Sequence, residues 1–400
     1  MNTIFDFHFS ASILFGPQRS LEIGRELSHL KAGSNRKVVI IADPGLDSFG
    51  LLDPIKKSLT DAGFEYTLYK EVKSDPSCNA IDDATAAIRK VTPTAVIGIG
   101  GGSALDTAKF ATVLAALGEK AESFSLKETP IPKNFIPMIL IPTTAGTGAE
   151  VSRTVVFSDS RKRKVWTWGS AFIAECVILD PALTASLPKE ITAMTGMDAM
   201  VHGIEASTGQ RTNAFAQAFG MRAVDLVARY IERAMDNPGD MEARSGLLAA
   251  STMAGMAIDQ CGTGIAHAFG HALGTLAGIP HGRAVALSMD AAFSLNARKC
   301  TAPFFEVGRA LGVLNFCQNG NANKICSETE IAKLGADRFH ALLDKIGLKL
   351  SVHEDGLSEK DLKTLIEAVH APENSVILDN NCYMPTEDEL KMIGETILGR

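Results

Sequence analysis

Short apolar runs alternate with amphipathic stretches along the first half of the chain. The runs at 37–41, 66–72, 95–99, 137–141 and 176–179 predict strands, and the stretches at 48–62, 79–90 and from 104 onward predict helices. Uninterrupted apolar runs rich in valine and isoleucine are typical of strands that are buried on both faces. The alternation therefore predicts a mainly parallel sheet with helices on both of its faces.

The pattern changes after Asp180-Pro181. Ser186 and Pro188 mark the start of a helix, because serine caps helices and proline is tolerated in their first turn. Beyond them the period is helical, with no convincing strand, at 214–235, 241–260, 264–277 and 361–369. A polar stretch at 318–329 predicts a surface loop. We predict an α/β domain over 1–185, an all-α domain over 186–400 and a cleft between them.

Composition narrows the class of protein. The chain has 400 residues, 46% of them hydrophobic and 21% charged, as in an ordinary globular enzyme. A net charge of −7 argues against nucleic-acid binding. We expect a cytoplasmic protein, because neither a signal peptide nor an apolar stretch of membrane-spanning length is evident. The seven cysteines form no Cys-x-x-Cys pair, which favours reduced thiols over a disulfide framework.

Several histidines lie close together in the sequence of the predicted all-α domain. Asp198 and His202 are four positions apart, as are His267 and His271, and His281 follows shortly after. A spacing of four places two side chains on one helix face, one turn apart. One carboxylate with several imidazoles suits a divalent ion such as Fe(II), Zn(II), Co(II) or Mn(II). A single histidine on an apolar face is more often a hydrogen-bonded core residue, but a core seldom buries several of them with a carboxylate.

Two glycine-containing turns follow predicted strands. The turn at 98–103 opens a helix, so its amides form a candidate phosphate cradle, although Ser103 replaces the third glycine of the usual dinucleotide fingerprint. A second small-residue turn lies at 142–148. Asp43 ends the strand at 37–41, where a carboxylate accepts hydrogen bonds from a ribose and repels a 2′-phosphate, which favours NAD over NADP. The alternatives are a tight turn without a ligand and a helix-capping aspartate.

Five motifs in this order resemble the iron-containing (group III) metal-dependent alcohol dehydrogenases. They are Phe15-Gly16, GGGSALDTAK at 100–109, PTTAGTGAEV at 142–151, GMDAMVHGIE at 196–205 and HAFGHALGTLAGIPHG at 267–282. The resemblance covers nearly the whole chain. It implies a dinucleotide-binding α/β domain and a helical metal-binding, catalytic domain, the architecture of dehydroquinate synthase.

The resemblance also implies an activity and its residues. The activity is NAD(H)-linked oxidation of a small alcohol or reduction of an aldehyde, with Fe(II), or alternatively Zn(II), polarising the substrate oxygen. His271 is implied as a catalytic proton relay, and a homodimer or higher homo-oligomer is expected. The implied metal ligands are Asp198, His202, His267 and His281. The implied NAD contacts, beside Asp43, are Gly101, Gly102, Ser103, Asp106, Thr143, Thr144, Thr147 and Lys164.

Two other activities remain open within the same architecture, a maleylacetate-type reductase and a lyase similar to dehydroquinate synthase. The chain also departs from the family near the expected substrate pocket, at Arg153, Arg283 and 380–382. One hypothesis is that Arg153 or Arg283 recognises an anionic group on the substrate through a bidentate contact. The alternative is that both arginines are solvated or paired within the protein.

Overall fold

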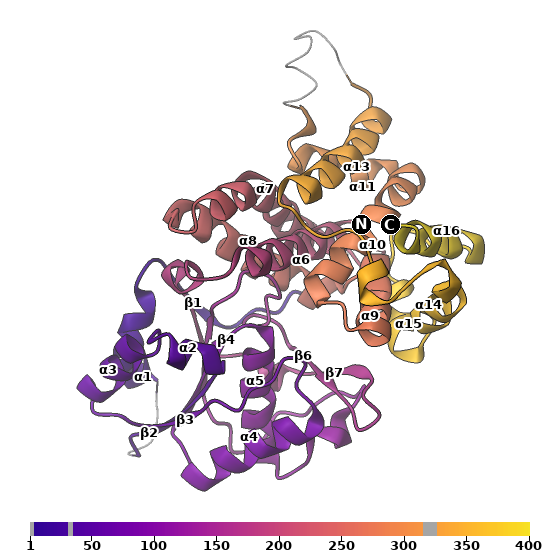
Figure 1. Ribbon diagram of the computed structural model, residues 1–400. Helices are drawn as coiled ribbons and strands as arrows, with labels where there is room; N and C mark the ends of the chain where they lie inside the picture. The colour runs from indigo at the N-terminus through magenta and orange to yellow at the C-terminus, as the bar shows by residue number, and fades with distance from the viewer. Residues whose placement is uncertain (1–3, 31–34, 315–325) are drawn as a thin grey trace. The chain divides into compact units, whose positions relative to one another are not determined.

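The protein is described by a computed structural model that covers residues 4–30, 35–314 and 326–400. The chain divides into two compact units (Figure 1). One is Phe9–Ser186, and the other joins the segment that ends at His8 to Leu187–Arg400. The sequence placed that N-terminal segment in the α/β domain. It belongs to the helical unit because Phe5 and Phe7 pack edge-to-face on Phe215, with ring centroids 5.5 and 5.4 Å apart.

The first unit is built on a six-stranded sheet in which each neighbouring pair of strands is parallel, in the order β1-β8-β5-β4-β2-β3. Its central strands are almost wholly buried, as their continuously apolar sequences predict. The strands are β1 Ser12–Phe15, β2 Lys37–Ala42, β3 Glu65–Tyr69, β4 Ala95–Gly100, β5 Met138–Pro142 and β8 Cys176–Leu179. A separate antiparallel hairpin consists of β6 Thr154–Ser158 and β7 Lys164–Trp168.

Helices cover both faces of this sheet. Side chains of α1 and α3 pack against alternate residues of β2 and β4, such as Val38, Ile40 and Ile97. Helix α5 lies on the other face, where Gly98 admits Ala108, since a Cβ at Gly98 would lie 2.7 Å from that methyl group. The α-helices are α1 Ile23–His29, α2 Pro44–Ser48, α3 Asp53–Asp61, α4 Cys78–Val91 and α5 Gly102–Leu117.

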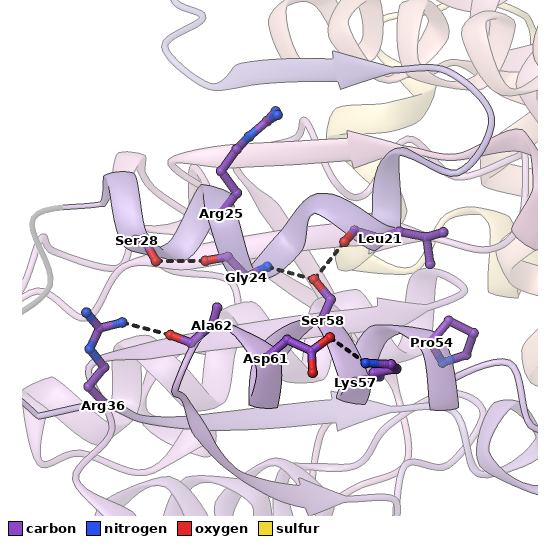
Figure 2. Close-up of a pocket in the computed structure, with 10 residues that line it drawn as sticks. All are labelled: Leu21, Gly24, Arg25, Ser28, Arg36, Pro54, Lys57, Ser58, Asp61 and Ala62. Carbon is purple, nitrogen blue, oxygen red and sulfur yellow. Dashed lines mark hydrogen bonds and ion pairs between the residues drawn. The ribbon is translucent and has the colours of Figure 1, made fainter.

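A surface depression of about 660 Å³ lies between α1 and α3 (Figure 2). Gly24 lets the two helices meet, because a Cβ there would lie 2.3 Å from the carbonyl oxygen of Ser58. Lys57 pairs with Asp61 at 2.6 Å, and Arg36 donates a hydrogen bond to the carbonyl of Ala62. The depression is thus a helix-packing groove whose basic side chains are engaged by neighbours, and it lies apart from every predicted site residue of this unit.

The second unit contains no strand among its described residues, as the sequence predicts. Its α-helices are α6 Lys189–Thr208, α7 Ala214–Asp236, α8 Met241–Cys261, α9 Ile265–Ala277, α10 His281–Lys299, α11 Thr301–Ala310, α13 Glu328–Lys345, α14 Leu362–Val369, α15 Pro372–Leu378 and α16 Glu387–Leu398. Most of the surface loop predicted at 318–329 lies outside the described residues. The predicted end of this loop was wrong. Ser327 and Glu330 form a reciprocal capping box, so α13 has begun by residue 328.

The fold class is therefore the one predicted, an α/β unit with a parallel sheet and an all-helical unit. No described helix combines the length and the apolar character that a membrane span needs.

Candidate functional site

Three helices of the second unit bring the candidate metal donors together. Helix α6 carries Asp198 and His202 one turn apart, α9 carries His267 in its first turn, and α10 begins at His281. Asp198, His202 and His267 are buried, whereas the side chain of His281 is 28% exposed. The spacing of four thus places Asp198 and His202 on one face, as predicted.

One carboxylate oxygen lies near all three imidazoles of this cluster. The Oδ1 atom of Asp198 is 3.8 Å from the Nε2 atoms of His202 and His267 and 3.6 Å from that of His281. These separations exceed hydrogen-bond length, and this buried oxygen has no hydrogen-bond partner among the described residues.

The donor set fits a divalent ion. One ligand atom from each of Asp198, His202, His267 and His281 lies within 4.8 Å of the others. Metal–ligand bonds of about 2.0–2.2 Å place two donors of a tetrahedral site roughly 3.3–3.6 Å apart. The observed separations are close to these values, so an ion at the centre would satisfy the buried oxygen that the protein itself leaves without a partner.

A glycine lets α10 reach α6. At Gly282 an added Cβ would lie 2.3 Å from the carbonyl oxygen of Met194 and 3.4 Å from the Cβ of Asp198. Gly278 ends α9 in the left-handed conformation, at φ 66°, and Pro280 precedes α10 as its N-cap residue. The Gly-Ile-Pro-His-Gly turn therefore delivers His281 to the cluster at a backbone separation that only glycine permits.

Glu205 supports the cluster and was not predicted from the sequence. Its carboxylate accepts hydrogen bonds from the backbone amides of Gly264 and Ala266, at 2.8 and 2.7 Å, and so caps the start of α9. It also lies 2.5 Å from Nδ1 of His267. Burial raises the pKa of Glu205 to about 7. A carboxylate that accepts the Nδ1 proton of a histidine fixes the ring so that Nε2 faces the metal position.

Replacing Glu205 with glutamine should weaken metal binding by about 10–100-fold, because the orienting partner of His267 loses its charge and one acceptor oxygen. The measurement is competition with a chromophoric chelator under anaerobic conditions. The matched control is Glu232→Gln on α7, whose carboxylate instead pairs near the surface with Arg338 and Lys345. Equal affinities of the two variants would contradict the positioning role of Glu205.

His271 lies beside the cluster rather than within it. Its ring centroid is 6.2 Å from that of His267 and 5.5 Å from that of His281. Its Nδ1 lies 3.2 Å from Oδ1 of Asn374 on α15, and the amide nitrogen of Asn374 donates to the carbonyl of Ala368 at 3.0 Å. That second bond fixes the amide orientation, so Nδ1 of His271 is the donor and Nε2 is the basic nitrogen.

The two glycine-containing turns meet at the carboxyl edge of the sheet in the first unit. Gly101 faces Thr144, and a Cβ at Gly102 would lie 2.8 Å from the Cγ2 atom of Thr147, so side chains are excluded there. Oδ2 of Asp43 accepts the amide proton of Gly101 at 2.7 Å. Asp43 thus braces the start of α5 directly, rather than capping the helix that follows it, where it makes no side-chain cap.

Ser103 and Lys164 approach the same loop from two sides. The hydroxyl of Ser103 accepts a hydrogen bond from the amide of Asp75 at 3.3 Å, and Nζ of Lys164 lies 3.3 Å from the carboxylate of Asp75. Asp75 has φ 48°, in the left-handed region, and follows β3 at the same edge as Asp43 and Gly101. Sequence reasoning did not single out Asp75, although its place before Pro76 marks a turn.

Asp106 and Thr143 are more deeply placed than the other predicted NAD contacts. Asp106 is buried, accepts the amide proton of Val156 at 3.0 Å and lies 3.2 Å from Nζ of Lys109. Thr143 is buried and its amide donates to the carbonyl of Gly100 at 2.9 Å. Asp106 therefore ties α5 to β6, whereas Thr143 joins the two turns, and the contact of either residue with NAD remains a prediction.

The anion hypothesis for Arg283 is wrong. Arg283 is buried, its guanidinium contacts both carboxylate oxygens of Asp355 at 3.0 and 2.8 Å, and its Nε donates to the carbonyl of Lys349. A guanidinium engaged in this way serves the packing of the helical unit. Arg153 precedes β6 in the first unit, and its role remains a prediction.

Comparisons with known proteins match both units. Residues 10–181 match the family described as iron-containing alcohol dehydrogenase, and 192–398 match the C-terminal region of the Fe-containing alcohol dehydrogenase family. A sulfoacetaldehyde reductase of Bilophila wadsworthia is 32% identical over 92% of each chain.

Solved structures agree with this match. A 1,3-propanediol oxidoreductase superimposes with a TM-score of 0.90 and 26% identity over 98% of this chain and all of that one. A sulfoacetaldehyde reductase from Bifidobacterium kashiwanohense, in complex with NAD⁺, gives 0.84 and 25% over 99% of both chains.

Fold and site together define an oxidoreductase that acts on CH–OH groups. The chain belongs to the iron-containing alcohol dehydrogenase family. It is a metal-dependent, NAD-linked alcohol dehydrogenase or aldehyde reductase, as the comparisons favour over the lyase alternative. Membership of this family implies NAD(H) and a divalent metal.

Proposed function

We propose that the chain interconverts a small alcohol and its aldehyde with NAD, using Fe(II) held by Asp198, His202, His267 and His281. One observation carries this proposal: three imidazole nitrogens surround a buried carboxylate oxygen at distances suited to a shared ion. A metal held by these residues would supply Lewis acidity toward the substrate oxygen, and bound NAD would supply the hydride acceptor or donor. Zn(II) and Mn(II) suit the same donors, so the choice of Fe(II) rests on the family.

The helical unit also holds a group suited to proton transfer. With the Nδ1 proton of His271 directed to Asn374, we propose that Nε2 takes up the alcohol proton during oxidation and returns it during reduction. Glu205 keeps the ring of His267 in place during this exchange through its contact with Nδ1. In this proposal His271 is the catalytic residue, and Asn374 and Glu205 are positioning residues.

In the first unit, we propose that the turns containing Gly101–Ser103 and Thr143–Thr147 bind the pyrophosphate of NAD. Amides at the start of α5 and the absence of side chains at both glycines support this. Lys164 brings a basic side chain to the same loop, because its ammonium pairs with Asp75, whose backbone amide donates to Ser103. Asp43 supports NAD over NADP, because its half-buried carboxylate would oppose a 2′-phosphate at this edge.

Replacing Asn374 with alanine should lower kcat by about tenfold while metal content and KM stay unchanged, because His271 loses the acceptor that fixes its tautomer. Asn374→Asp is the informative partner, since it keeps an acceptor for His271 but loses the donor to Ala368. Recovery of kcat in the aspartate variant supports the tautomer role. Equal losses in both variants would assign Asn374 to packing alone.

The test of the proposed function is metal add-back under anaerobic conditions. Bound metal is removed from the protein with a chelator, and NADH production is then measured after addition of Fe(II), of Zn(II) or of no metal. The substrates are short diols, primary alcohols, choline and sulfoacetaldehyde, and NADP replaces NAD in parallel. Turnover that depends on metal and is fastest with Fe(II) and NAD is expected. Absence of turnover with every metal, while NAD still binds, would overturn the proposal in favour of the lyase-type reaction.

A further inference from the structure

Two segments of the helical unit that are distant in sequence lie side by side at the end of α10. The amides of Asn296 and Asn381 exchange two hydrogen bonds, each of 3.2 Å. The ammonium of Lys299 lies 5.5 Å from the ring centroid of Tyr383. The two contacts are made by the residues on either side of Cys382, and Cys300 directly follows Lys299, so the two cysteines lie close together.

The thiols are in contact and are reduced. Both are free and partly exposed, and each thiol lies close enough to shift the pKa of the other. The neighbouring thiol lowers the pKa of Cys300 and, together with burial, raises the pKa of Cys382, so Cys300 ionises more readily. Cys300 lies at the junction of two helices, as the C-cap residue of α10 and the N-cap residue of α11.

The lower pKa of Cys300 makes it the better nucleophile of the pair. Lys299 is adjacent in sequence, and its ammonium pairs with Glu389 at 2.8 Å. The buried cysteines differ from this pair: burial raises the pKa of Cys78, Cys176 and Cys261, which makes each of them inert. Cys326 is partly exposed and serves as a reference thiol.

We propose that Cys300 and Cys382 form a reversible disulfide when the protein meets a low-molecular-weight disulfide such as oxidised glutathione. The Cys300 thiolate attacks one glutathione sulfur, and the first glutathione leaves as a thiolate. Cys382 then loses its proton to that thiolate and attacks the sulfur of Cys300, which releases the second glutathione. Two protein thiols are oxidised and one glutathione disulfide is reduced to two thiols.

The bond would form next to a junction that supports the metal cluster. Asn380, two residues before Cys382, donates from its amide to the carbonyls of Cys261 and Thr263, each at 2.8 Å. Gly264 follows and is held by Glu205. A disulfide at Cys382 would therefore restrain the segment that fixes the start of α9. Its formation requires neither metal nor NAD, so the proposal stands apart from the proposed function.

The test uses the full zinc-loaded chain, which avoids iron-dependent oxidation. After incubation with oxidised glutathione, the remaining thiols are alkylated and peptides are mapped by mass spectrometry. We expect a peptide that links Cys300 to Cys382, two fewer alkylated cysteines, and recovery of both after dithiothreitol. The matched control, Cys326→Ser, should give the same link.

Single variants test the order of attack. Cys382→Ser should retain glutathione on Cys300 as a stable mixed disulfide, whereas Cys300→Ser should carry several-fold less glutathione on Cys382. Alkylation of both cysteines in the oxidised wild-type chain, or glutathione found on Cys326 alone, would overturn the proposal. Equal glutathionylation of the two single variants would overturn the assigned roles of attacking and resolving thiol.

Discussion

Replacing Asp198 with asparagine should remove metal-dependent activity while leaving the metal-free protein folded. The substitution keeps the side-chain volume but removes the charge at the centre of the three imidazoles. Loss of a partner of a metal ligand costs about 10–100-fold in affinity, so loss of a ligand should cost at least about a hundredfold. Metal content measures the loss of affinity, and NADH production measures the loss of activity.

Thermal unfolding separates a ligand from a packing residue. A metal present at about 100 times its Kd stabilises the folded state by roughly 2.7 kcal/mol, which the wild-type chain should show and Asp198→Asn should not. Without metal the two midpoints should nearly coincide, because Oδ1 of Asp198 has no hydrogen-bond partner to lose. The control Asp225→Asn changes a carboxylate that pairs with Arg222 and Arg229 on α7 and should keep the metal response. A variant that still gains stability from metal would exclude Asp198 as a ligand.

Replacing Lys109 with methionine should destabilise the α/β unit by about 3–5 kcal/mol, since it leaves a buried carboxylate and several buried carbonyls without their charged partner. The side chain is fully buried, and its ammonium donates to the carbonyls of Ala149, Ser152 and Thr154 at 2.8, 3.1 and 2.7 Å. It also compensates the buried carboxylate of Asp106 at 3.2 Å. Methionine keeps the length of the side chain but leaves these oxygens without a donor.

The same substitution should raise KM for NAD, because the carbonyls that Lys109 holds follow directly on the turn at Thr143–Gly148. Denaturant unfolding and NAD titration are the measurements. Lys57→Met is the control, since Lys57 is exposed and its pair with Asp61 is on the surface, where such pairs contribute about 0–1 kcal/mol. A Lys109 variant as stable as the control would show that water replaces the ammonium.

The sequence predicted the elements whose pattern depends on burial alone. The strands at 37–41, 95–99 and 176–179 lie in the sheet because both of their faces are covered, which makes their text continuously apolar. The hairpin of β6 and β7 was not predicted, because the basic run at 161–164 forms its turn and the first residue of β7. β1 was also missed, since an edge strand of four residues carries little pattern.

At the site, the spacing of residues in the sequence predicted which side chains share a helix face, but not which residues of other elements contact that face. Asp198 and His202 could be paired by their separation in sequence, whereas the role of Glu205 depends on amides of Gly264 and Ala266 from another helix. The signal for Glu205 was a carboxylate three residues after His202 in small, apolar text. Spacing also could not decide between the two interpretations of Arg283, because Asp355, the partner that confirms pairing within the protein, is remote in sequence.

The helical unit is discontinuous in sequence, and this has a consequence for synthesis on the ribosome. The residues of Phe9–Ser186 are all available before the helices of the other unit emerge, so the α/β unit can fold first. The segment with Phe5 and Phe7 emerges before the α/β unit but packs on Phe215 of α7, so it stays exposed until α7 has been synthesised. We therefore expect bulky N-terminal fusions to impair maturation of the helical unit and leave folding of the α/β unit unaffected.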